Sequence, residues 1–71
     1  MGITLKAARM NKGYDQEKAA KLIGISPDTL SNYERGKTFP DVPIIKKIEE
    51  VYEIKYDDIN FLPENYENIV N

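Results

Sequence analysis

The sequence predicts an all-α fold, a compact bundle of about five helices. Apolar residues recur at intervals of three and four through most of the chain, which places them along one face of successive helices. These periodic stretches are separated by short segments in which Asp or Ser, Gly and Pro stand where helices start and stop. Because 71 residues make one small domain, the helices must share a single core.

The first two helices are expected over residues 3–11 and 16–23. Gly13 ends the first, and Asp15 is a suitable N-cap for the second. Gly24 then provides the permissive backbone that a sharp turn requires. The residues expected to point inward are Ile3, Leu5 and Ala8 in the first helix and Ala19, Ala20, Leu22 and Ile23 in the second.

A third helix is expected over residues 27–35. Ser26 is its N-cap, Pro27 fills the first position, where a missing N–H costs nothing, and Asp28 favours the positive end of the helix dipole. Its large apolar residues are Leu30 and Tyr33, and the other side chains are polar. A helix, a tight turn and a second helix with a polar outer face are how many proteins present a helix to the major groove of DNA.

The rest of the core comes from two further helices. Asp41 is expected to cap a fourth helix that runs through Tyr52. Its broad apolar face consists of Ile44, Ile45, Ile48, Val51 and Tyr52. A short fifth helix is expected over residues 56–62, closed by Pro63, although residues 54–61 also suit a strand by residue type.

The domain boundary is expected at residue 62, so that residues 1–62 form the domain and residues 63–71 a C-terminal tail. Apolar residues at helical spacing run into that tail, namely Leu62, Tyr66, Ile69 and Val70. The stripe is either a dimerisation element or scattered apolar residues in a tail without structure.

The charge distribution is uneven. The chain carries a net charge of −2, which is unusual for a nucleic-acid binder. Residues 1–38, however, carry seven basic against four acidic residues, a net of +3, whereas residues 39–71 carry three against eight, a net of −5. This asymmetry indicates a negatively charged partner for the first half, with the acidic half facing away.

Composition argues against several other classes of function. With no His or Cys, a disulfide and a structural zinc site are not expected, and no carboxylate, Lys, Ser or Tyr group forms a recognisable catalytic constellation. We therefore expect no enzyme, no metal, no cofactor and no small-molecule ligand. No apolar run approaches the ~20 residues that span a membrane, and no signal-peptide core is present, so a cytoplasmic protein is expected.

The chain resembles the helix-turn-helix family of phage repressors and Cro proteins over residues 5–62. The segments that carry the resemblance are LKAARMNKG, DQEKAAKLIGIS and TLSNYERGKTFP, followed by the apolar run after Pro43. The order of ten residues makes it specific: Arg9, Gln16, Ala20, Gly24, Ser26, Leu30, Glu34, Arg35, Gly36 and Pro40. The resemblance implies a lambda-repressor-like bundle that binds double-stranded DNA and regulates transcription.

Candidate base contacts lie on the exposed first turns of the third helix. The amide of Asn32 suits adenine, the carboxylate of Asp28 can accept from cytosine, and the methyl group of Thr29 can meet that of thymine. Family members commonly carry base-reading side chains at the positions of Pro27, Asp28 and Asn32, but Pro27 has no polar side-chain group. The alternatives are that Pro27 and Asp28 only start the helix, and that Asn32 belongs to a solvated face.

Phosphate contacts are expected on both sides of this helix. In the family, the residue matching Gln16 holds a phosphate at the start of the second helix, where the helix dipole also favours an anion. The remaining candidates lie on the third helix or follow it, namely Ser31, Arg35, Lys37 and Thr38. The alternative for Gln16 is an ordinary solvated helix start.

The resemblance also implies a structural ion pair between Arg9 and Glu34, which would hold the third helix to the first. The competing assignment takes Arg9 to a phosphate. We expect a small Cro-like repressor, because the length leaves no room for an effector domain, acting as a homodimer on an operator. The alternative is a protein-interaction module, such as an antitoxin or anti-repressor, which would cover the outer face of residues 26–38 with a partner.

Overall fold

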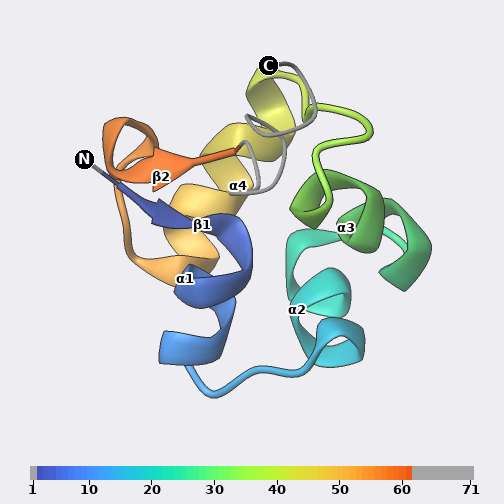
Figure 1. Ribbon diagram of the computed structural model, residues 1–71. Helices are drawn as coiled ribbons and strands as arrows, with labels where there is room; N and C mark the ends of the chain where they lie inside the picture. Colours follow the sequence, from blue (N-terminus) through green and yellow to red (C-terminus); the bar gives the residue numbers. More distant parts are fainter. Residues whose placement is uncertain (1, 62–71) are drawn as a thin grey trace.

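Four α-helices and one pair of short strands make up the described part of the chain, residues 2–61 of a computed structural model (Figure 1). A three-residue 3-10 helix, η1, precedes the second strand. In chain order the elements are β1 (Ile3–Thr4), α1 (Leu5–Asn11), α2 (Gln16–Ile23), α3 (Pro27–Glu34), α4 (Val42–Tyr52), η1 (Tyr56–Asp58) and β2 (Ile59–Asn60).

Each α-helix begins at a polar side chain that accepts a hydrogen bond from the helix's own first turn. The predicted caps Asp15, Ser26 and Asp41 all do so, and Thr4 caps α1 in the same way. Gly24 ends α2 in the left-handed conformation, with φ of 93°, which an L side chain rarely adopts. The sharp turn into α3 therefore depends on this glycine.

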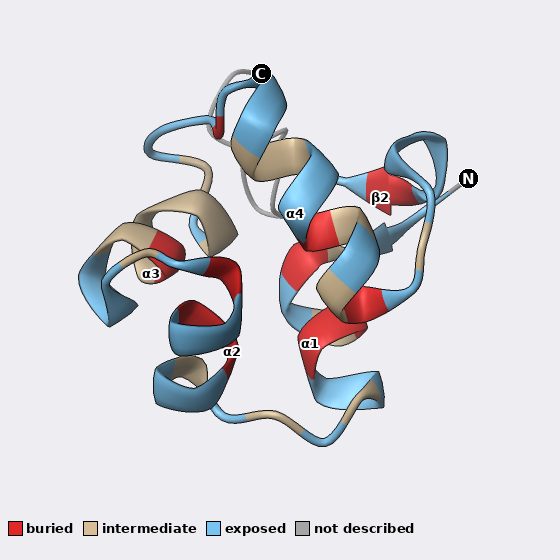
Figure 2. Cartoon of the chain, turned by 180° about the vertical axis from the view of Figure 1, so that it is seen from behind, coloured by how far each residue is buried: buried red, intermediate tan, exposed pale blue. Residues whose placement is uncertain are grey.

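The core lies where α1, α2, α3 and α4 meet, and Figure 2 shows its buried residues on the inner sides of these helices. Ala19 and Ala20 are fully buried, and their small side chains let α2 pack closely against α3 and α4. The buried apolar residues are Leu5, Ala8, Ala19, Ala20, Ile23, Leu30, Ile48, Tyr52 and Ile59.

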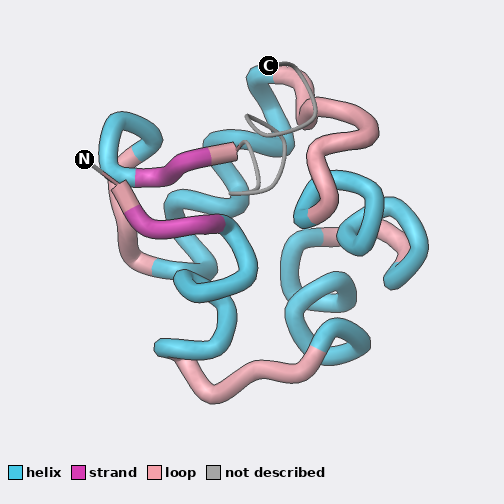
Figure 3. Tube along the Cα trace, viewed as in Figure 1, coloured by secondary structure: helices cyan, strands magenta, loops and turns pink. Residues whose placement is uncertain are grey.

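The prediction of an all-α bundle of about five helices is only partly right. Ile3 belongs to β1 rather than to the first helix, and it pairs in parallel with Ile59 of β2 (Figure 3). The expected helix over residues 56–62 shrinks to η1, and the alternative of a strand holds for residues 59–60. The β-branched Ile59 thereby enters the core at 8% exposure while its backbone lies in the strand pair.

Close backbone approach explains why Gly2 precedes β1. A Cβ atom at this position would collide with the backbone carbonyl of Asp58 at the end of η1. Only glycine lets the first strand enter beside the second at this distance.

Two residues predicted to point inward do not. Leu22 is 41% exposed and Ile3 is 37% exposed. A helix turns by about 100° per residue, so the stripe formed by Ala19, Ala20 and Ile23 leaves Leu22 on its flank. The predicted tail, residues 63–71, and the whole stripe that starts at Leu62 lie outside the described residues.

Candidate nucleic-acid interface

The outer face of α3 is polar and open. Pro27 and Asp28 are exposed, whereas Leu30 is fully buried and fixes the helix on the core. Farther along, Arg35 is exposed at the C-cap of α3. The other candidate contacts are half-buried in the case of Thr29, Ser31 and Asn32 and exposed in the case of Lys37 and Thr38. The fold thus brings the predicted base contacts to one surface, the first turns of α3.

The first turn of α3 is held by a small network. Ser26 Oγ accepts from the backbone N–H of Thr29 at 3.1 Å and donates to Thr29 Oγ1 at 2.9 Å. The hydroxyl of Thr29 is therefore directed back at the cap. Its methyl group is the part of this side chain left for an apolar base contact.

Asn32 forms a hydrogen bond with Arg35, which is itself a candidate phosphate contact. Arg35 Nη2 donates to Asn32 Oδ1 at 3.2 Å, across one turn of α3. The amide oxygen thus points toward the guanidinium, and Asn32 Nδ2 keeps its donors. Their spacing of three residues on one helix is the sequence signal for this contact.

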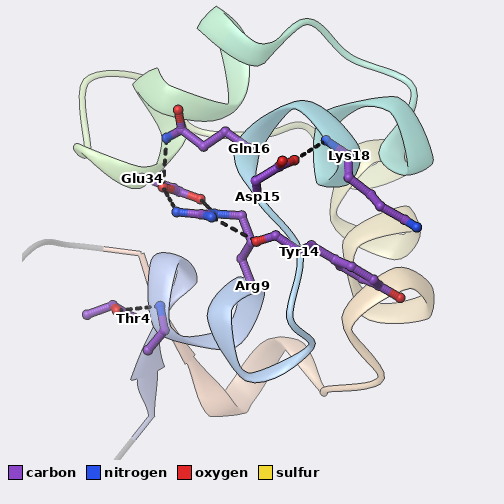
Figure 4. Close-up of polar contacts among 8 residues, drawn as sticks. Thr4, Arg9, Tyr14, Asp15, Gln16, Lys18 and Glu34 are labelled. Carbon is purple, nitrogen blue, oxygen red and sulfur yellow. Dashed lines mark hydrogen bonds and ion pairs between the residues drawn. The ribbon is translucent and has the colours of Figure 1, made fainter.

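Arg9 of α1 and Glu34 of α3 point toward each other (Figure 4). Arg9 Nε donates to Glu34 Oε2 at 2.7 Å, and Arg9 Nη2 donates to Oε1 at 3.3 Å. The two side chains are only 9% and 4% exposed. The remaining terminal nitrogen of Arg9, Nη1, donates to the carbonyl of Tyr14 at 2.9 Å. This geometry engages Arg9 with the scaffold through all three nitrogens.

Glu34 also binds a third donor that the sequence did not indicate. Gln16 Nε2, at the start of α2, donates to Glu34 Oε1 at 3.1 Å (Figure 4). One carboxylate therefore joins α1, α2 and α3, and it fixes the orientation of the Gln16 amide. The second amide hydrogen and the carbonyl oxygen of Gln16 take no part in this bond.

Tyr52 of α4 completes the surroundings of this network. Burial raises the pKa of Tyr52 well above its ordinary value, the Glu34 carboxylate raises it further, and Arg9 lowers it. Its ring contacts that of Tyr14, with centroids 6.5 Å apart. The ion pair thus lies near the buried ring of Tyr52, where solvent screens it little.

Within residues 2–61, no three His, Cys, Asp or Glu side chains gather in a way that would hold a metal ion. None of the helices described there has the length and apolar character to cross a membrane.

Comparison with known proteins gives the family. A model of the helix-turn-helix family matches residues 5–59, from the start of α1 to β2. The chain belongs to the helix-turn-helix family. This match covers α2, α3 and the turn at Gly24, so the unit whose geometry is described above is the one that the family shares.

Three relatives from Bacillus subtilis illustrate the range of the family. The chain is 39% identical over 57 residues to the HTH-type transcriptional regulator ImmR, covering 80% of this chain and 45% of ImmR. It is 40% identical over 58 residues to the uncharacterized HTH-type transcriptional regulator YazB, covering 82% and 84%. To YonR, an SPbeta prophage-derived uncharacterized HTH-type transcriptional regulator, it is 34% identical over 56 residues, covering 79% and 52%. The chain thus spans about half of ImmR and YonR but most of YazB.

Proposed function

We propose that this protein is a sequence-specific regulator of transcription that inserts α3 into the major groove of double-stranded DNA. The observation that carries the proposal is the combination of an open polar face on α3 with the buried Glu34 carboxylate at its C-terminal end. The face is available to base edges, and the carboxylate holds the helix in a fixed position on α1 and α2.

Base reading is assigned to four residues in the first turns of α3. Asn32 is the principal reader, and its bond with Arg35 exchanges for one with adenine when the helix enters the groove. Asp28 accepts from the amino group of cytosine, and Thr29 offers its methyl group to thymine. Pro27 contributes an apolar contact at the helix start.

Phosphate contacts flank this helix on two sides. Gln16 donates its second amide hydrogen to one phosphate, held in place by its bond with Glu34. Arg35 binds a second phosphate through its guanidinium. The remaining contacts on that side come from Ser31, Lys37 and Thr38. These contacts set the register of the protein on DNA and make binding dependent on salt.

The regulatory mode that we propose is repression by a homodimer at an operator, in the manner of a Cro protein in the cytoplasm. A single domain of this size reaches only one half-site, and two copies are needed for operator affinity. The printed names of ImmR, YazB and YonR all describe HTH-type transcriptional regulators, and that of YonR adds a prophage origin. These relatives support a regulator in preference to an enzyme.

A protein-interaction module is the second candidate, and it requires a partner on the outer face of residues 26–38. Among the described elements, none buries Pro27, Asp28 or Arg35. The DNA proposal makes use of this exposure directly, since the same residues supply the base and phosphate contacts.

Binding to random and selected duplexes tests the proposal. Random-sequence duplex should bind weakly, with an association constant that falls linearly against salt on logarithmic axes. Repeated selection from a random library should enrich one near-palindromic sequence. Absence of any salt-dependent binding, together with no enriched sequence, would favour the protein-interaction module.

A further inference from the structure

The hydroxyl of Tyr52 is a buried polar group that no described residue pairs. Tyr52 is the last residue of α4 and is 3% exposed, and its Oη atom has no hydrogen-bond partner among residues 2–61. Nearly all buried polar groups in folded proteins are paired, either with protein or with ordered water. An unpaired hydroxyl would cost stability, because it loses its hydration on burial and gains nothing in return.

The hydroxyl lies near the buried ion pair without bonding to it. Burial raises the pKa of Tyr52, the Glu34 carboxylate raises it further and the Arg9 guanidinium lowers it, so both charges act on this group across the core. Tyr14 connects the two regions. Its ring contacts that of Tyr52, and its carbonyl accepts from Arg9 Nη1 at 2.9 Å (Figure 4).

The ion pair has hydrogen-bonding capacity that the described residues leave unused. Arg9 donates through three N–H groups, two to Glu34 and one to Tyr14, whereas a guanidinium carries five. Glu34 Oε1 accepts from Arg9 and from Gln16, but Oε2 accepts within this set from Arg9 alone, and a carboxylate oxygen can accept two bonds. Since the two side chains are only 9% and 4% exposed, bulk solvent does little to satisfy these groups.

A water molecule meets the needs of all three groups. It can accept from the Tyr52 hydroxyl or from an Arg9 N–H, and it can donate to Glu34 Oε2. Internal waters typically make about three hydrogen bonds to buried polar groups that lack other partners. An ion is disfavoured here, because the guanidinium repels a cation and the carboxylate repels an anion.

We propose that Tyr52 Oη, the Arg9 guanidinium and Glu34 Oε2 form a binding site for one internal water molecule, which joins α4 to the ion pair. Glu34 of α3 already binds Arg9 of α1 and Gln16 of α2. The water adds α4, so that all four helices meet at one polar cluster. Tyr52 is then a positioning residue, because it acts on α3 through the water and Glu34.

Thermal melts of the full chain give the first test, with Tyr52→Phe and the matched control Tyr56→Phe. Tyr52→Phe keeps the ring and removes one partner of the water, so the melting temperature should fall by about 4–8 °C. Tyr56 is 48% exposed, and its control variant removes the same atom from a ring in contact with solvent. The control should leave the melting temperature nearly unchanged.

Oxygen-17 magnetic relaxation dispersion gives the second test, because it counts the long-lived internal waters of a protein in solution. The wild type and Tyr56→Phe should hold the same number, and Tyr52→Phe should hold one fewer. This readout separates the proposal from a merely structural role of the Tyr52 ring, which would not change the number of bound waters.

Two results would overturn the proposal. An unchanged or raised melting temperature in Tyr52→Phe is the first, because removing an unpaired buried hydroxyl is neutral or stabilising. A lowered melting temperature with an unchanged number of internal waters is the second, since it would indicate a direct bond from Tyr52 to another protein group.

The wild type alone decides the matter if Tyr52→Phe fails to fold. A high-resolution crystal structure should then show a water within hydrogen-bond distance of Tyr52 Oη and of Arg9 or Glu34. A Tyr52 hydroxyl with no water beside it would overturn the proposal. None of these measurements includes DNA, so their outcome is independent of the proposed function.

Discussion

Two ion pairs in this molecule have nearly the same N–O distance, but one is buried and the other is exposed to solvent. Arg9 and Glu34 approach to 2.7 Å with a Glu34 side chain 4% exposed, whereas Lys12 and Glu53 approach to 2.6 Å with a Glu53 side chain 74% exposed. The first joins α1 to α3, and Glu34 also binds Gln16 of α2. The second joins the end of α1 to the end of α4 in solvent, where it raises the pKa of Lys12 and lowers that of Glu53. Distance alone therefore does not indicate which pair supports the fold.

The same contrast holds for the two halves of the chain. Up to Thr38 the net charge is +3, and several polar side chains bind one another or cap helix starts. From Phe39 onward the net charge is −5, and the apolar side chains of Phe39, Val42 and Tyr56 are exposed. The proposed DNA contact uses the basic half, since the local distribution of charge and not the net charge sets the potential at a surface.

The largest effect is expected from Glu34→Ala. It would leave the Arg9 guanidinium buried without its partner and release Gln16, at a cost of about 3–5 kcal/mol, which approaches the whole stability of a domain this small. Thermal melts without DNA measure it. Glu53→Ala is the control and should leave the melting temperature nearly unchanged. Equal shifts for both variants would mean that burial does not distinguish the two pairs.

A specific loss is expected from Asn32→Ala. Removing the amide that is proposed to read adenine should weaken binding to the selected operator by about 1–3 kcal/mol, with little change on random duplex. Fluorescence anisotropy on both duplexes at one salt concentration measures the difference. Equal losses on the two would assign Asn32 to the backbone of DNA.

A smaller, uniform loss is expected from Arg35→Ala and from Gln16→Ala. Both should weaken binding to operator and random duplex by similar factors, because phosphates carry no sequence information. Arg35→Ala should also make the salt slope shallower by about one unit. If Arg35→Ala instead relaxes the preference at a single base pair, its bond with Asn32 would make it part of the base-reading unit.

The smallest effect is expected from Glu50→Gln on α4. Its side chain is 74% exposed, 3.9 Å from that of Lys47, in the half assigned to face away from DNA. Removing its charge should leave the salt slope of DNA binding unchanged. A steeper slope would show that this side of the domain also meets the phosphates.

Much of the fold could be predicted because the starts and ends of its helices depend on interactions within one helical turn. Asp15, Ser26 and Asp41 start helices where expected, since a short polar side chain before an apolar period satisfies the first N–H groups of a helix. Gly24 ends α2 as predicted for the same local reason. The solvent-facing residues of α3 could be predicted from the helical period alone, because its large apolar residues are Leu30 and Tyr33, three positions apart on one side of the helix.

Only the tertiary structure decided the rest. Ile59 suited either a short helix or a strand by sequence, and its pairing with Ile3, fifty-six residues away, selected the strand. The bond of Gln16 to Glu34 likewise joins residues distant in sequence. Local signals specify where a helix begins and which face is apolar, because they act within one turn. Contacts between elements depend on how several such faces share one core, and no single segment contains that information.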